Sequence, residues 1–94
     1  MTDKLRPIET VESRRREGID ATVSNVIEEF NGRFEMLSEH EYRLPTSIDI
    51  FYDVRDTLGG AEFRLVVTSL FAQGLDRVGA DARRQLRARV RQIA

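Results

Sequence analysis

The chain has 94 residues, of which 40% are hydrophobic and 33% are charged, and its formal net charge is −1. These values are typical of one small globular domain, and the absence of cysteine excludes disulfide bonds and thiolate metal ligands. Because residues 1–16 lack the apolar core of a signal peptide and no stretch approaches about 18 apolar residues, we expect a cytoplasmic protein with no membrane association.

Charge is distributed unevenly along the chain. Between Glu17 and Asp53 there are nine acidic and two basic residues, whereas six arginines and two aspartates lie between Leu75 and Ala94. Such a distribution indicates that the two ends of one domain attract each other, or that two copies of the chain do. We interpret the run Arg14–Arg16 as solvated charge that pairs with neighbouring glutamates.

The first 18 residues offer little apolar surface for packing. A helix over residues 7–18 would bury only Ile8 and Val11 before Gly18 ended it. We therefore expect residues 1–18 to be a flexible or marginally helical arm. Residues 19–94 are expected to form a single helical domain.

The segment from 20 to 39 is predicted to be a helix with Asp20 as its N-cap. Its apolar residues recur at helical spacing; they are Val23, Val26, Ile27, Phe30, Phe34 and Leu37. Asn31-Gly32 would signal a turn in a hairpin, but the helical period favours one continuous helix. We interpret His40, the only histidine, as an exposed residue of the connection that follows.

Residues 46–58 support two interpretations. As a strand, alternate positions are apolar: Ile48, Ile50, Tyr52 and Val54. As a helix, one face would carry Asp49, Asp53 and Asp56. Thr46 or Ser47 can cap the start of such a helix, and Leu58-Gly59 matches a helix C-terminus, so the end signals favour a helix.

Residues 61–78 present the same choice. As a strand, Phe63, Leu65 and Val67 are apolar at alternate positions and Val66-Val67-Thr68 is β-branched, but the alternation does not continue through 69–72. As a helix the segment is apolar on two faces, which is typical of a central helix or of one covered by a partner. The residues predicted to form the core or a dimer seam are Phe63, Leu65, Val66, Val67, Leu70, Phe71, Leu75 and Val78.

The segment from 80 to 94 is predicted to be a helix capped by Asp81. It carries a narrow apolar stripe and, beside it, a basic stripe made of Arg83, Arg84, Arg87 and Arg91. The predicted fold is therefore all-α, a small bundle of about four helices around the central apolar helix. The alternative is an α+β fold with a central β-hairpin at 47–69 flanked by helices.

Residue patterns that indicate catalysis are largely missing from the sequence. Gly59-Gly60 is not followed by the Lys-Ser/Thr of a phosphate-binding loop, and a single histidine gives little basis for a catalytic triad. The three aspartates of 49–56 are interpreted as a solvated face, although such a set can hold a hard cation. We predict that the protein is not an enzyme and has no cofactor or metal.

The basic stripe is the feature most suited to binding. Four guanidinium groups on one helical face can contact an acidic protein surface or the phosphates of a nucleic acid. Because the chain is nearly neutral, we favour the protein contact. The sequence thus predicts a small, non-catalytic regulatory or adaptor protein, forming a homodimer and binding an acidic partner, with nucleic-acid binding as the alternative.

Overall fold

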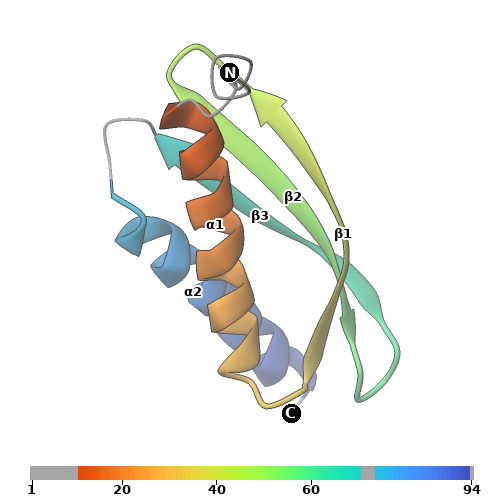
Figure 1. Cartoon of the computed structure of the whole chain (residues 1–94). Coiled ribbons are helices and arrows are strands. Elements are labelled where there is room, and N and C mark those ends of the chain that lie inside the picture. Colours follow the sequence, from red (N-terminus) through yellow and green to blue (C-terminus); the bar gives the residue numbers. More distant parts are fainter. Residues whose placement is uncertain (1–10, 71–73, 94) are drawn as a thin grey trace, which may run out of the picture.

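The computed structural model describes residues 11–70 and 74–93, which form an α+β fold (Figure 1). Its elements in chain order are helix α1 (Val11–Glu28), strands β1 (Phe34–Arg43), β2 (Ser47–Asp56) and β3 (Glu62–Leu70), and helix α2 (Asp76–Ile93). The strands form an antiparallel sheet in the order β1-β2-β3, and both helices lie against the same face of it. Within the described part of the chain, no helix is both long and apolar enough to span a membrane.

The predicted all-α fold is therefore wrong, and so is the description of the protein as a helical bundle. The segments 46–58 and 61–78, which were both expected to be helices, contain strands β2 and β3, and these strands pair as a hairpin. The alternative interpretation contains this hairpin but omits β1. The sheet, and not a central helix, is the element on which the core is built.

The helix predicted over residues 20–39 ends early, at its Asn-Gly pair. α1 stops at Glu28, and Asn31 and Gly32 then adopt left-handed backbone angles, with φ of 53° and 82°. A right-handed helix cannot contain this conformation, which asparagine and glycine adopt more readily than other residues. The chain therefore turns here, and Phe34 begins β1 with its ring buried in the core.

Strand β2 alternates strictly between the two faces of the sheet. Four fully buried side chains face the helices: Ile48, Ile50, Tyr52 and Val54. Asp49, Phe51 and Asp53 alternate with them and lie on the outer face of the sheet, which the helices do not cover. In a helix the four buried residues would be spread around the axis, so one helical face could not bury all of them.

The segment expected to be a central helix, residues 61–78, is strand β3 followed by the start of α2. Leu65 and Val67 face the core and are at most 1% exposed, whereas Val66 and Leu70 lie on the outer face and are 39% and 40% exposed. The two apolar faces seen in the sequence are therefore the two faces of a strand. Helix α2 begins at Asp76, so Asp81 lies inside it and is not its N-cap.

The core lies between the sheet and the two helices. α1 contributes Ile19, Val23, Val26 and Ile27, and α2 contributes Val78, Ala82 and Leu86. The helices pack closely because Gly79 has no side chain, since a Cβ atom there would lie 3.2 Å from Cγ2 of Thr22. This packing fixes the side of α2 that faces solvent.

The Gly59-Gly60 pair forms the β2–β3 turn and gives a matched pair of substitutions. Gly60 has a φ of +81°, a conformation that disfavours a Cβ atom, whereas Gly59 does not, and neither has a neighbouring atom within 4 Å of an added Cβ. We expect Gly60→Ala to lower the free energy of unfolding by about 1–2 kcal/mol. Gly59→Ala should change it by less than about 0.5 kcal/mol. Urea unfolding followed by circular dichroism measures both, and equal effects would contradict this description of the turn.

Candidate functional site

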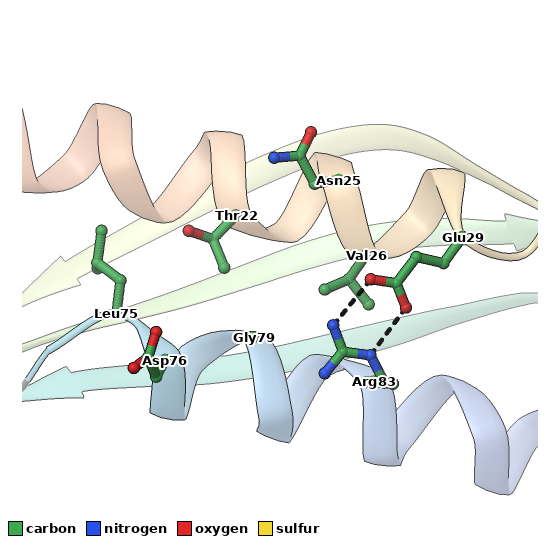
Figure 2. Close-up of a pocket in the computed structure, with 8 residues that line it drawn as sticks. All are labelled: Thr22, Asn25, Val26, Glu29, Leu75, Asp76, Gly79 and Arg83. Carbon is green, nitrogen blue, oxygen red and sulfur yellow. Dashed lines mark hydrogen bonds and ion pairs between the residues drawn. The ribbon is translucent and has the colours of Figure 1, made fainter.

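The structure divides the predicted basic stripe of α2 into two parts. Arg83 turns toward α1, where its Nε and Nη2 donate to the two carboxylate oxygens of Glu29, each at 2.8 Å (Figure 2). This hydrogen bond lowers the pKa of Glu29, and the charges of Arg83 and Arg87 lower it further. Arg83 therefore acts as an intramolecular link between the helices and is removed from the candidate binding surface.

The other three arginines of the stripe remain exposed. The side chain of Arg84 is 70% exposed, and its Nη2 lies 3.1 Å from a carboxylate oxygen of Asp81 on the same helix. Arg87 and Arg91 are also exposed. Among the described residues, neither of these two donates a hydrogen bond to a carboxylate. Salt bridges between exposed groups such as Arg84 and Asp81 contribute little, so a partner's carboxylate can replace Asp81.

Arg77 belongs to this surface and was missed in the sequence. Arg77 is exposed and lies seven residues before Arg84, and Arg91 lies seven residues after Arg84. Residues seven apart lie on the same side of a helix. We name Arg77, Arg84, Arg87 and Arg91 the arginine row. The spacing was visible in the sequence, but it could be recognised only once the start of α2 was known.

An open groove of about 340 Å³ lies between α1 and α2. Its walls include Thr22 and Asn25 from α1 and Leu75 and Asp76 at the start of α2 (Figure 2). The Glu29–Arg83 ion pair closes one end. The lining residues include no histidine, and the hydroxyl of Thr22 donates to the carbonyl of Gly18.

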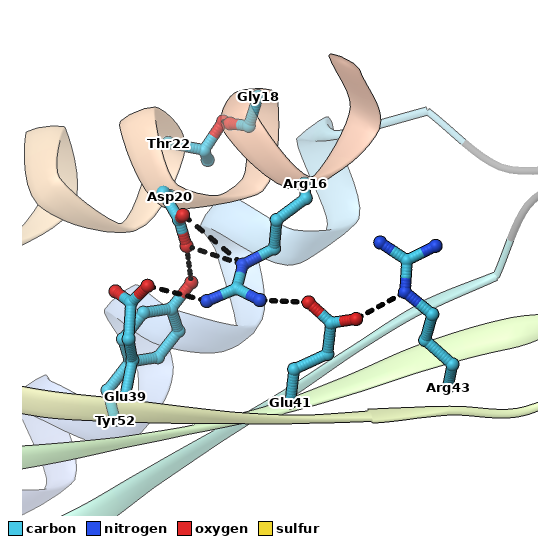
Figure 3. Close-up of polar contacts among 8 residues, drawn as sticks. All are labelled: Arg16, Gly18, Asp20, Thr22, Glu39, Glu41, Arg43 and Tyr52. Atoms are coloured by element: carbon cyan, nitrogen blue, oxygen red, sulfur yellow. Dashed lines mark hydrogen bonds and ion pairs between the residues drawn. The ribbon is translucent and has the colours of Figure 1, made fainter. Parts of the chain in front are cut away.

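A second polar cluster joins α1 to the sheet (Figure 3). Arg16 donates to both carboxylate oxygens of Asp20 at 3.2 Å, to Glu39 at 2.6 Å and to Glu41. The hydroxyl of Tyr52 donates to Asp20 at 2.7 Å. Burial, followed by this hydrogen bond, raises the pKa of Tyr52, so the tyrosine stays protonated.

The interpretation of Arg14–Arg16 as solvated charge fails for two of the three residues. Arg16 sits inside the cluster just described, where burial disfavours its charge but the hydrogen bonds and charges of the carboxylates outweigh burial and raise its pKa. Arg15 donates to the hydroxyl of Ser69 at 3.0 Å and to the carbonyl of Leu70. Both side chains hold α1 to the sheet, so this cluster is structural.

The three aspartates of β2 are separated by the strand geometry. Asp49 accepts a hydrogen bond from Thr68, and Asp53 accepts from Ser38 and Arg64, all on the outer face. Asp56 points to the opposite face and is fully buried. The described residues contain no group of three or more metal-binding side chains placed to hold a metal ion.

The side chain of Gln85 on α2 occupies part of the free edge of β3. The side-chain amide of Gln85 donates to the carbonyl of Val66 at 2.6 Å and accepts from its N–H at 3.2 Å. An exposed strand edge can pair with a strand of another protein, and Gln85 occupies the middle of this one. Strand addition at β3 is therefore hindered.

The residues predicted to form a core or dimer seam do not form one surface. Leu65, Val67 and Val78 are buried, and Phe63 and Leu75 pack against the core of the same chain. Val66 and Leu70 lie on the outer face of the sheet. Phe71 lies outside the described residues. The dimer stays a prediction. Among the described members of the predicted set, Val66 and Leu70 are the two that lie on the outer face and could form part of a seam.

Comparisons with known proteins do not extend this description. No protein-family model, curated protein or solved structure matches the chain. The candidate site consequently rests on the chemistry of the arginine row alone.

Proposed function

We propose that this protein is a non-catalytic binding module that contacts an acidic surface of another protein through the arginine row. The observation that carries the proposal is the exposure of four guanidinium groups on one face of α2, while Arg83 is held by Glu29. Guanidinium groups form paired hydrogen bonds with carboxylates more readily than ammonium groups do. The fold holds the row on a packed helix, so binding does not require the backbone to become ordered.

The charge of the arginine row would determine the affinity, the association rate and the salt dependence of binding. Each exposed ion pair contributes about 0.2–1 kcal/mol, so several must form together to give useful affinity. They also accelerate association and weaken as salt screens them. The module is therefore expected to bind quickly and with a strong salt dependence.

Nucleic-acid binding through the same row is the second candidate. Phosphates are also ligands for arginine, and their contacts are equally sensitive to salt. Against this candidate, the chain carries a net charge of −1, and Glu28 is exposed at the end of the neighbouring helix α1. This carboxylate would repel a phosphate backbone laid across both helices.

A titration with poly-L-glutamate tests the proposal. We expect amide NMR shifts confined to α2 at about 20 mM salt and lost at about 500 mM salt. The double variant Arg84→Gln/Arg91→Gln should weaken binding about tenfold. The control is Arg55→Gln/Arg64→Gln, which removes the same charge from the outer face of the sheet. Equal losses in the two variants, or shifts centred on the sheet, would overturn the proposal.

The predicted homodimer is tested separately by sedimentation velocity. A concentration-dependent increase in sedimentation coefficient at tens of micromolar, abolished by Val66→Ser/Leu70→Ser, would support a dimer through the outer face. A constant monomer mass would remove the dimer from the proposal without affecting the arginine row.

A further inference from the structure

We infer that the element of the partner that binds the arginine row is a single acidic α-helix, lying along α2, with carboxylates spaced seven residues apart. This inference rests on the proposed function and specifies the shape of the partner. It is carried by three features: the spacing of the arginines on α2, the short residues between them, and the carboxylates beside the row on the side of α1.

The spacing matches a helix. Arg77, Arg84 and Arg91 recur every seven residues, which corresponds to steps of about 10.5 Å along the axis with a drift of only about 20° per step. A helix aligned with α2 presents carboxylates at the same interval if they also recur every seven residues. Residues on one face of a β-strand recur about every 6.7 Å, so a strand would bring its carboxylates out of register with the row.

The residues between the arginines on this side of α2 are short, and they include Asp81, whose carboxylate is paired with Arg84. Ala80 and Ala88 are both exposed on the same side of α2. Helices pack with their axes about 8–10 Å apart, and the distance depends on the side chains at the contact. The two alanines therefore leave room for side chains of a second helix between the long arginines.

Carboxylates lie beside the arginine row on the side of α1. Glu29 is tied to Arg83 at the side of the row, and Glu28 is exposed beside it at the end of α1. A helix about 10–12 Å in diameter can lie on α2 without covering these carboxylates. A nucleic-acid duplex that received α2 in its major groove, which is about 12 Å wide, would place a phosphate strand on each side of α2, and one of these strands would meet the exposed carboxylate of Glu28. A helical partner therefore fits this surface better than a duplex.

The test compares two synthetic peptides of identical composition. One carries glutamates at seven-residue spacing on one helical face, and the other distributes the same glutamates around the helix; circular dichroism must show equal helicity. Calorimetry at low salt should give about tenfold tighter binding of the first peptide to the full chain. The substitutions Ala80→Gln/Ala88→Gln, which keep every charge, should remove this preference and leave poly-L-glutamate binding unchanged.

The other outcomes separate the inference from the proposed function. Equal affinity for both peptides and for poly-L-glutamate would overturn the helical partner and leave the acidic-surface proposal standing. No binding of any acidic probe at low salt would overturn both. Tighter binding of a generic DNA or RNA duplex than of either peptide would also overturn both and favour the phosphate-binding alternative.

Discussion

Replacing Ile50 with asparagine is expected to unfold most of the protein, whereas the same substitution at the next residue, Phe51, should leave it folded. Ile50 is fully buried between the sheet and the helices. Asparagine there removes apolar packing and buries an amide, which together lower the free energy of unfolding by on the order of 5 kcal/mol. That is comparable to the total stability of many small domains.

Phe51 lies on the outer face of the sheet. Its ring contacts that of Tyr42 at a centroid distance of 5.3 Å, and the guanidinium of Arg64 lies 5.6 Å from its centroid. Phe51→Asn removes these contacts and should lower the free energy of unfolding by about 1–2 kcal/mol. Thermal unfolding and the dispersion of amide NMR signals measure the difference. In the helix that the end signals predicted, both residues would occupy the same apolar face, so similar damage by the two substitutions would contradict the strand.

The neighbouring residues Ile50 and Phe51 also show why the fold was only partly predictable from the sequence. The sequence of β2 alternates between apolar and other residues, but Ser47 and Gly59 resemble the caps of a helix and favour a helix over the same residues. Cap signals contribute about 1 kcal/mol, whereas burying four large side chains on one face contributes several times that. Only the structure shows that the two helices cover that face.

The exposed face of α2 could be predicted from the spacing of its arginines. The ion pairs between residues far apart in the sequence could not. Arg84, Arg87 and Arg91 are exposed on one side of α2, as their spacing indicated. The pairing of Arg83 with Glu29 joins residues 54 positions apart, and no local pattern reports such a contact. Arg16 was misjudged for the same reason, because its partners Glu39 and Glu41 come from a strand that was not predicted.

A second large loss of stability is expected when the ion pair between Asp56 and Arg33 is broken. The carboxylate is fully buried and accepts from Nε and Nη2 of Arg33 at 2.7 and 3.1 Å, and from the N–H of Leu58 at 3.0 Å. It thereby joins the turn after α1 to the β2–β3 turn. Asp56→Asn keeps the shape but leaves the Arg33 charge without its carboxylate. We expect the melting temperature to fall by about 10 °C.

A control substitution separates this ion pair from a general effect of removing a carboxylate. Asp49→Asn removes an aspartate from the outer face, where the new amide oxygen can still accept from Thr68. It should shift the melting temperature by only a few degrees. Equal shifts for the two variants would contradict the structural role of Asp56.

The pH dependence of stability provides an independent test of the same ion pair. The hydrogen bond from Arg33 lowers the pKa of Asp56 below its ordinary value of 3.8. The carboxylate of Asp56 therefore binds a proton more tightly in the unfolded chain than in the folded chain. Its contribution to the free energy of unfolding is complete above about pH 5 and is lost as the pH falls below about 4. The difference in the free energy of unfolding between the natural chain and the Asp56→Asn variant should therefore become smaller as the solution is acidified. A difference that stays constant between pH 7 and pH 2 would show that the charge of Asp56 does not stabilise the fold.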